Sequence, residues 1–252
     1  MDLSVVIPVY NGERHIGESL RTLQGYLAKN IPSAEVIVVD DGSTDGTRRV
    51  LESLAGPNLR VIGLDCNQGK FGALAAGMAA CRGSCCLFTD ADLPYDLEAI
   101  PYLTRLVTER GFHVVIGDRK LRESEYHEHL TFLRRLTSEA FSFFVGVIVT
   151  GGLFDTQCGL KGFRADVAKA IFPLLRDKGF SGDVELLYVA LKYNLEVKRI
   201  PARLRRSHPS SVNILAHAPQ MLWRISHLRQ NWKRGYYESA DLARIARQAY
   251  WE

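Results

Sequence analysis

The sequence predicts an α/β fold in which helices flank a mostly parallel central sheet. Along the first half of the chain, short runs of β-branched and apolar residues alternate with longer stretches of helical periodicity, a pattern typical of strands joined by crossover helices. The runs SVVIPV and VIVVD show no polar alternation, as expected for parallel strands covered on both faces. A chain of 252 residues has room for one such domain with a helical appendage.

The apolar runs and their spacing place each element in order. Strands are expected at Leu3–Val9, Glu35–Asp40, Arg60–Leu64, Cys85–Thr89 and His113–Gly117, with helices between them near 13–29, 44–54, 70–81 and 96–109. After residue 118 the alternation breaks, and the run CGLKGF is expected to add a strand to the sheet. Helices near 165–175 and 183–193, a strand at Leu195–Pro201 and helices over 214–230 and 238–250 complete the prediction. Since no linker interrupts these elements, we expect residues 1–225 to form one domain and 226–252 a helical extension of it.

Composition and charge narrow the class of protein. The chain has 46% hydrophobic, 10% aromatic and 24% charged residues, as in ordinary globular proteins. A formal net charge of +4 does not imply a nucleic-acid partner. The five cysteines are odd in number and lack CxxC spacing, which favours a reducing compartment over a disulfide scaffold or a zinc site. The chain opens in an apolar run without a basic prefix, which indicates a first strand and not a signal peptide. We therefore expect a cytoplasmic protein.

The most apolar segment, Phe141–Phe154, leaves two interpretations open. It is shorter than the roughly 20 residues that span a bilayer. One interpretation is a buried core helix, and the other is an apolar surface that dips into a membrane interface. The second would attach the protein peripherally to the cytoplasmic membrane face, together with basic residues near the C-terminus.

Polar residues follow three of the expected strands at their carboxyl ends, where open parallel sheets bind ligands. They are Tyr10 and Asn11 after the first strand, Asp40 and Asp41 at the second, and Asp90-Ala91-Asp92 after the fourth. The spacing of Asp90 and Asp92 puts two carboxylates on one side of an extended segment, where they can share a divalent cation with phosphate oxygens. The local alternatives are a helix N-cap before Pro94 and a turn at Asp40 and Asp41. A dinucleotide-binding dehydrogenase is disfavoured, since YNGERHIG lacks the glycine spacing that admits a pyrophosphate.

Four motifs carry a family resemblance. The runs VVIPVYNGE, VVDDGSTDGT, NQGKFGALAAGM and TDADL, in this order and spacing, resemble the family 2 glycosyltransferases, which have the GT-A fold. The later runs DTQCGLKGFRADVAKAIF and FSGDVELLYVALKYNLEVKRIPARLR resemble the dolichyl-phosphate glucose and mannose synthase branch, so the resemblance covers roughly residues 1–225. It implies an inverting enzyme that moves a hexosyl group from a nucleotide-diphosphate sugar to a polyprenyl phosphate. A UDP-sugar is preferred over GDP-mannose, because the DTQC run looks more like the glucose branch.

The same resemblance implies roles for individual residues. The donor is bound by Pro8, Tyr10, Asn11, Asp40 and Asp41 at the base and ribose, by Lys70 after the NQG motif, and by Asp90, Ala91 and Asp92. Asp90 and Asp92 hold the donor's Mg²⁺ or Mn²⁺, with Asp92 as the direct ligand and Asp90 as partner of the ribose or the metal. The branch often carries a lysine where this chain has Val212, so contact with the donor phosphates passes to Arg205 or Arg206. Arg119, Arg134 and Arg135 resemble the residues that receive the acceptor phosphate, although Arg134 and Arg135 equally fit a solvated charged face.

The role of Asp183 stays open between two mechanisms. Many inverting family 2 enzymes use an aspartate near this position as general base towards a hydroxyl. A phosphate acceptor is already anionic and needs no base, and Asp183 and Glu185 would then orient a sugar hydroxyl or a basic residue. We expect Asp92, Asp183 and Arg119 to be catalytic. The alternative function is transfer to a saccharide, small-molecule or protein hydroxyl with Asp183 as base, and a third is a nucleotide-binding or interaction protein without catalysis. The aromatic C-terminal segment also allows a homodimer.

Overall fold

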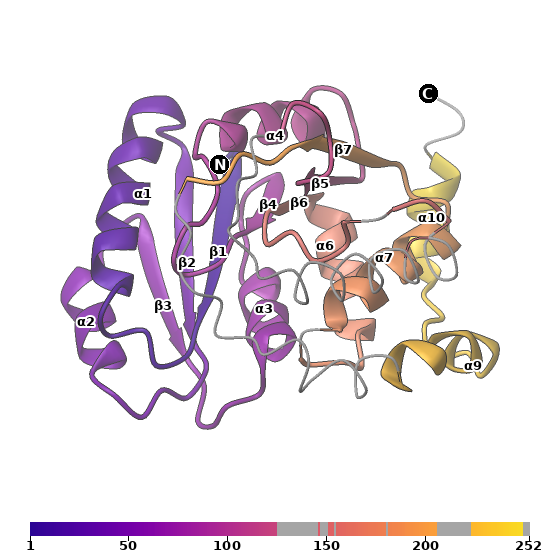
Figure 1. The fold of residues 1–252 in the computed structure, drawn as a ribbon, viewed down its shortest axis with the longest axis horizontal. Helices are drawn as coiled ribbons and strands as arrows, with labels where there is room; N and C mark the ends of the chain where they lie inside the picture. The colour runs from indigo at the N-terminus through magenta and orange to yellow at the C-terminus, as the bar shows by residue number, and fades with distance from the viewer. Residues whose placement is uncertain (125–145, 147–150, 154, 180, 206–222, 249–252) are drawn as a thin grey trace.

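A computed structural model describes residues 1–124, 146, 151–153, 155–179, 181–205 and 223–248 of the chain. Within these residues, seven strands form one sheet in the order β3-β2-β1-β4-β6-β5-β7 (Figure 1). The strands are β1 (Leu3–Val9), β2 (Ala34–Asp40), β3 (Leu59–Gly63), β4 (Cys85–Phe88), β5 (Val114–Asp118), β6 (Lys161–Arg164) and β7 (Val197–Pro201). The sheet is the mostly parallel one that the apolar runs predict, and the fold class is confirmed.

Strand β6 is the exception to the parallel arrangement. It pairs antiparallel with both β4 and β5, and its first residue, Lys161, lies opposite Phe88 at the end of β4. The other pairs are parallel. Because β6 runs backwards, the residues just before it lie at the same edge of the sheet as the carboxyl ends of its neighbours. The sequence predicts the strand in CGLKGF, and the structure supplies its direction.

Helices cover both faces of the sheet, each with its own apolar cluster. The helices are α1 (Ile16–Asn30), α2 (Thr47–Leu54), α3 (Lys70–Ala79), α4 (Ala99–Thr108), α6 (Ala165–Ile171), the 3₁₀ helix η2 (Phe172–Leu174), α7 (Gly182–Lys192), α9 (Leu228–Lys233) and α10 (Ala240–Gln248). Side chains of α1, α2 and α4 pack with Val5 and Ile7 on one face. Those of α3, α6, α7 and the C-terminal helices pack with Val6 and Ile37 on the other. The alternation along β1 and β2 is the period of two that a sheet covered on both faces requires.

The C-terminal helices belong to this second cluster. Tyr237, Leu242 and Ile245 are buried in it. The Tyr237 hydroxyl donates to Glu185 Oε1 of α7 at 2.5 Å, and the Tyr193 hydroxyl donates to the Tyr237 carbonyl at 2.8 Å. The described residues 226–248 therefore pack against α7, the helix that carries Asp183.

The expected elements agree with the described ones to within a few residues at each end. Most of the expected helix over 214–230 and most of Phe141–Phe154 lie outside the described residues, so the two interpretations of that apolar segment stay predictions. The part of the chain that the structure describes contains no helix long and apolar enough to cross a membrane.

Candidate functional site

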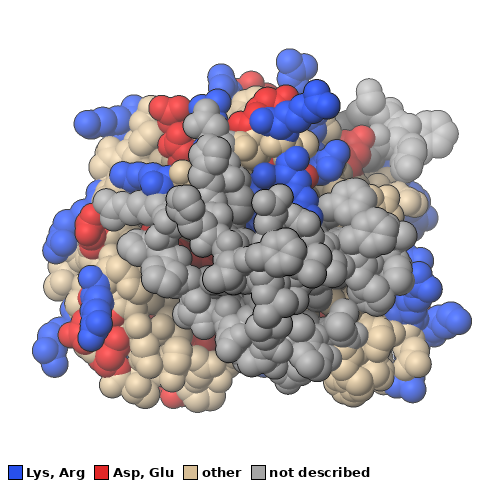
Figure 2. All heavy atoms as spheres, in the orientation of Figure 1, with Lys and Arg blue, Asp and Glu red and all other residues tan. Residues whose placement is uncertain are grey.

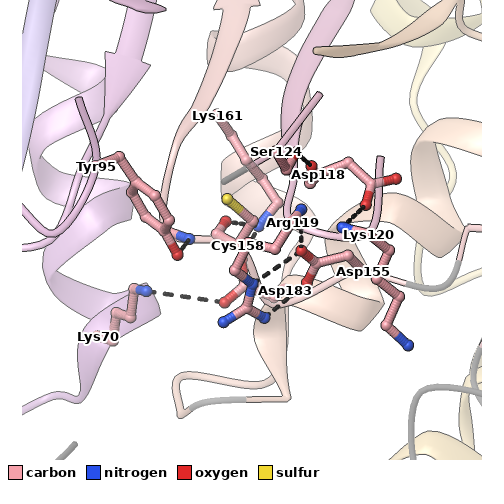
Figure 3. Close-up of polar contacts among 11 residues, drawn as sticks. Lys70, Tyr95, Asp118, Arg119, Lys120, Ser124, Asp155, Cys158, Lys161 and Asp183 are labelled. Carbon is pink, nitrogen blue, oxygen red and sulfur yellow. Dashed lines mark hydrogen bonds and ion pairs between the residues drawn. The ribbon is translucent and has the colours of Figure 1, made fainter. Parts of the chain in front are cut away.

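Charged side chains from four elements meet where β4 ends and β6 begins. Figure 3 shows three of them, Lys70, Lys161 and Asp183. Asp90 follows β4, Lys161 opens β6, Lys70 opens α3, and Asp183 lies in the first turn of α7. Lys70 Nζ lies 2.8 Å from Asp90 Oδ1 and 3.8 Å from Asp183 Oδ2, while Lys161 Nζ pairs with Asp183 Oδ1. Three residues singled out by the sequence, Lys70, Asp90 and Asp183, are thus brought together.

The charge on Lys70 is maintained by its acidic neighbours. Burial by itself would lower the pKa of Lys70, but the Asp90 and Asp183 carboxylates outweigh it and raise the pKa above the ordinary value of a lysine. The backbone before Lys70 is fixed by Asp41, whose carboxylate accepts hydrogen bonds from the Gln68 and Gly69 amides at 2.7 and 2.9 Å. Gly69 has φ +85° and faces the Lys178 carbonyl, a conformation and an approach that favour glycine.

Lys161 is a site residue that the sequence reasoning missed. Its side chain is fully buried, its ammonium donates to the Cys158 carbonyl at 2.7 Å, and it lies over the Phe88 ring at 5.4 Å from the centroid. The signal in the sequence was a single lysine inside the apolar run CGLKGF. A lysine is almost never fully buried unless it is paired, so its position in an expected strand pointed to a carboxylate partner.

A second ion pair lies beside the first. Arg119, directly after β5, donates from its backbone N–H, Nε and Nη2 to the Asp155 carboxylate at 2.7, 2.8 and 2.7 Å. Burial would raise the pKa of Asp155, but these bonds and the charge of Arg119 lower it below the usual range. Asp155 was not singled out, because its place at this edge depends on the reversed direction of β6. The predicted contact of Arg119 with an acceptor phosphate stays a prediction, and Arg134 and Arg135 lie outside the described residues.

The ends of β1 and β2 are joined by short polar contacts. Asn11 Oδ1 accepts from the Thr44 amide at 2.8 Å, and the Asp40 carboxylate accepts from the Ser43 amide at 3.0 Å. Asp40 therefore stabilises the turn after β2 and is also a candidate for binding the nucleotide of the sugar donor. Tyr10 is 48% exposed at the end of β1, and Pro8 lies within β1 opposite Val39. All of the first-strand candidates lie at the carboxyl edge of the sheet, as predicted.

The loop after β4 contacts the segment after β7. The Arg205 amide donates to the Pro94 carbonyl at 2.7 Å, and Tyr95 forms a β-bridge with Leu204. Arg205, exposed, is thereby placed beside the loop that holds Asp90, Ala91 and Asp92, whereas Arg206 lies outside the described residues. Among the described residues there is no cluster of three or more His, Cys, Asp or Glu able to hold a metal by itself.

Comparison with known proteins identifies a matching family and several relatives. The profile of Glycosyl transferase family 2 matches residues 4–172. The chain is 29% identical over 249 residues to a dolichyl-phosphate beta-glucosyltransferase of Dictyostelium discoideum, covering 94% of this chain and 76% of that protein. It is 31% identical over 174 residues to a dodecaprenyl-phosphate galacturonate synthase of Rhizobium johnstonii, covering 68% and 50%. A solved glucosyl-3-phosphoglycerate synthase from Mycobacterium tuberculosis, in complex with Mn²⁺ and UDP-glucose, has a TM-score of 0.65 at 20% identity over 90% of this chain and 78% of that chain, which shows a common fold.

Proposed function

We propose that this chain, which belongs to glycosyl transferase family 2, moves a hexosyl group from a nucleotide-diphosphate sugar to a polyprenyl phosphate. Similarity to a dolichyl-phosphate glucosyltransferase along almost the whole chain supports this acceptor class, as does similarity to a dodecaprenyl-phosphate sugar synthase. Among donors, a UDP-sugar is preferred and GDP-mannose is kept as the alternative.

The structural observation that favours a phosphate acceptor concerns Asp183. Its two carboxylate oxygens face two ammonium groups, those of Lys161 and Lys70. A general base towards a hydroxyl would have to leave one of these ion pairs before it could accept a proton. An acceptor phosphate needs no base, since its oxygen is already anionic near neutral pH. The second candidate function, transfer to a hydroxyl with Asp183 as base, is therefore less well supported.

In the proposed reaction an acceptor phosphate oxygen attacks the anomeric carbon from the face opposite the leaving group. A bond from carbon to the acceptor oxygen forms, the bond from carbon to the diphosphate oxygen breaks, and the nucleotide diphosphate leaves with the electron pair. In this proposal Lys70 offsets charge on the diphosphate, and Arg119, whose Nε and Nη2 bind Asp155, contributes positive charge beside the acceptor phosphate. These residues act by positioning the two substrates and by offsetting charge.

The residues present fit a divalent cation shared with the donor. Asp90 and Asp92 offer hard carboxylate oxygens, the ligands that Mg²⁺ and Mn²⁺ prefer, and Mg²⁺ is commonly held by one or two carboxylates plus substrate phosphates. A site of this kind agrees with the lack of a larger ligand cluster in the described part of the chain. When bound, the cation would offset the negative charge that grows on the leaving diphosphate.

A lipid acceptor requires contact with a membrane, and we propose peripheral contact through the C-terminal end of the domain. Arg229, Lys233 and Arg234 on and after α9 are exposed, and Trp223 is 64% exposed. Basic side chains gather at the right-hand end of the face in Figure 2, where Figure 1 places α9. Basic residues next to an exposed aromatic suit an anionic lipid surface. Attachment to the cytoplasmic membrane face and a homodimer through the C-terminal segment stay predictions.

A donor-by-acceptor assay tests the proposal. The purified chain is incubated with Mn²⁺ and either UDP-glucose or GDP-mannose, with and without a short polyprenyl phosphate. We expect a lipid-extractable glycolipid that forms only with the acceptor and is lost on chelation or in Asp92→Asn. Donor hydrolysis without glycolipid would contradict the polyprenyl phosphate and leave a family 2 transferase with a hydroxyl acceptor.

A further inference from the structure

Lys161 occupies an unfavourable place for a lysine. Its side chain is fully buried between β4, β5 and α7, among the largest fully buried side chains in the described residues. Removing an ammonium from water is costly unless the group is both paired and hydrogen-bonded. Lys161 meets this requirement through the Asp183 carboxylate and the Cys158 carbonyl, the latter at 2.7 Å. Because such a pair is often no more stable than well-packed apolar side chains, stability by itself gives little reason for a lysine here.

The pair is the inner end of a row of alternating charges. From the interior outwards the row consists of Lys161, Asp183, Lys70 and Asp90, drawn from β6, α7, α3 and the loop after β4. Lys161 is 0% exposed, Lys70 14% and Asp90 34% at the side chain. Lys70 and Asp90, the partly exposed members of the row, can contact a bound donor. Lys161 is fully buried behind Asp183 and cannot.

We infer that Lys161 is a positioning residue, which fixes Asp183 so that Asp183 and Asp90 together hold the Lys70 ammonium where the donor diphosphate binds. The inference rests on the proposed function only in assigning Lys70 to the donor. Lys161 binds Asp183 Oδ1, so Oδ2 is the oxygen left turned towards Lys70 at 3.8 Å. Lys161 is the member of the row that holds the Asp183 carboxylate in this rotamer. Without it, the attraction of Lys70 would be free to draw the carboxylate into another rotamer.

This arrangement changes how substitutions at Asp183 are understood. Asp183→Asn leaves the buried Lys161 ammonium without its counter-charge, and breaking one side of a buried pair is strongly destabilising. Loss of activity in Asp183→Asn is therefore expected whether Asp183 is a base or an anchor. A test has to measure whether Lys161 acts through Lys70.

A double-mutant cycle on donor binding provides that test. Lys161→Met, Lys70→Met and the double variant are titrated calorimetrically with Mn²⁺ and either UDP-glucose or GDP-mannose, at a temperature where circular dichroism shows each to be folded. We expect Lys161→Met to weaken binding of the recognised donor about tenfold in the wild-type background and less than about twofold in the Lys70→Met background. The matched control is Lys169→Met, an exposed lysine on α6, expected to change binding less than about twofold in both backgrounds.

Equal weakening by Lys161→Met in both backgrounds, or none in either, would overturn the inference, since a purely structural lysine has no reason to depend on Lys70. If Lys161→Met does not fold, the cycle is run on the neutral pair Lys161→Met with Asp183→Asn, which leaves no buried charge unpaired. In this background the effect of Lys70→Met on donor binding is measured. An effect as large as in the wild type would overturn the inference, and an effect under about twofold would support it.

Donor binding is read without any acceptor, so the inference and the proposed function fail separately. Coupling between Lys161 and Lys70 without glycolipid formation would contradict the acceptor and support the positioning role. Glycolipid formation without coupling would support the acceptor and contradict the positioning role. Binding of neither donor would contradict both.

Discussion

The Asp90 carboxylate packs directly against the backbone of Gly159, so closely that a Cβ atom on Gly159 would lie 2.6 Å from Asp90 Cγ. The Gly159 amide in turn donates to the Tyr95 hydroxyl at 3.3 Å. The segment before β6 therefore forms one wall of the place where Asp90 meets Lys70. The position of a candidate metal ligand depends on the lack of a side chain at a residue far from it in the sequence.

Gly159→Ala is expected to displace Asp90 and to lower the rate of sugar transfer about 100-fold, since a misplacement of about 1 Å at a reacting centre costs that much. Transfer from the recognised donor to a polyprenyl phosphate is the measurement. The matched control is Gly25→Ala, an exposed position in α1 where an added Cβ meets no atom within 4 Å. It should retain wild-type activity, and a Gly159→Ala enzyme of wild-type rate would contradict the prediction.

Asp155→Asn should lower the free energy of unfolding by about 3 kcal/mol at neutral pH, because Arg119 loses its buried partner. The pKa of Asp155 is lowered below the ordinary value of 3.8, with Arg119 outweighing the effect of burial. A lowered folded pKa gives stability that is complete above the unfolded pKa and is lost as the pH falls through the folded one. Denaturant unfolding should therefore show a constant gap to wild type from about pH 7 to pH 5, which narrows below about pH 4.

The control for this pH series is Asp166→Asn. Asp166 is 47% exposed at the side chain, and the substitution removes its ion pair with Arg164. Its effect should stay under about 1 kcal/mol throughout, as for other surface pairs. A gap for Asp155→Asn that widens towards acid pH would contradict the assigned role of Arg119.

Tyr237→Phe should lower the free energy of unfolding by about 1.5–3 kcal/mol, because Glu185 loses a buried hydrogen bond from the Tyr237 hydroxyl. Thermal and denaturant unfolding measure the change, and a single cooperative transition would support our proposal that residues 226–252 are part of the same domain. Tyr102→Phe, at a tyrosine that is 45% exposed, serves as the control with little expected change. Two separate transitions in the wild type would contradict the proposal.

Charge reversal to Glu at Arg229, Lys233 and Arg234 should weaken binding to vesicles of anionic lipid at least about 100-fold at low salt, at about 1 kcal/mol for each basic residue lost. Co-sedimentation with vesicles gives the partition coefficient. The control carries the same change in charge at three exposed residues of α1 and α2, namely Arg21, Lys29 and Arg49. Equal losses in both triple variants would mean that net charge, and not the surface at α9, sets the binding.

Much of the fold follows from local sequence patterns. Uninterrupted apolar runs predict the strands β1, β2, β4 and β5, because a strand buried on both faces of a sheet needs apolar residues at successive positions. Helical periodicity predicts the helices between them. The GT-A type of fold that the resemblance implied is confirmed. Because the carboxyl ends of parallel strands lie at one edge of the sheet, the sequence also predicts that Asp90 lies near the polar residues after β1 and β2.

The sequence by itself thus determined the α/β class, the family and the acidic edge of the sheet, since each depends on residues near one another in the chain. The tertiary structure decided that β6 runs antiparallel, which places Asp155, Gly159 and Lys161 at the carboxyl edge of the neighbouring strands. It also decided that the two oxygens of Asp183 face Lys161 and Lys70. Strand direction and ion pairing depend on contacts between residues far apart in the chain, and the free energy that selects them comes from packing and desolvation that local patterns do not record.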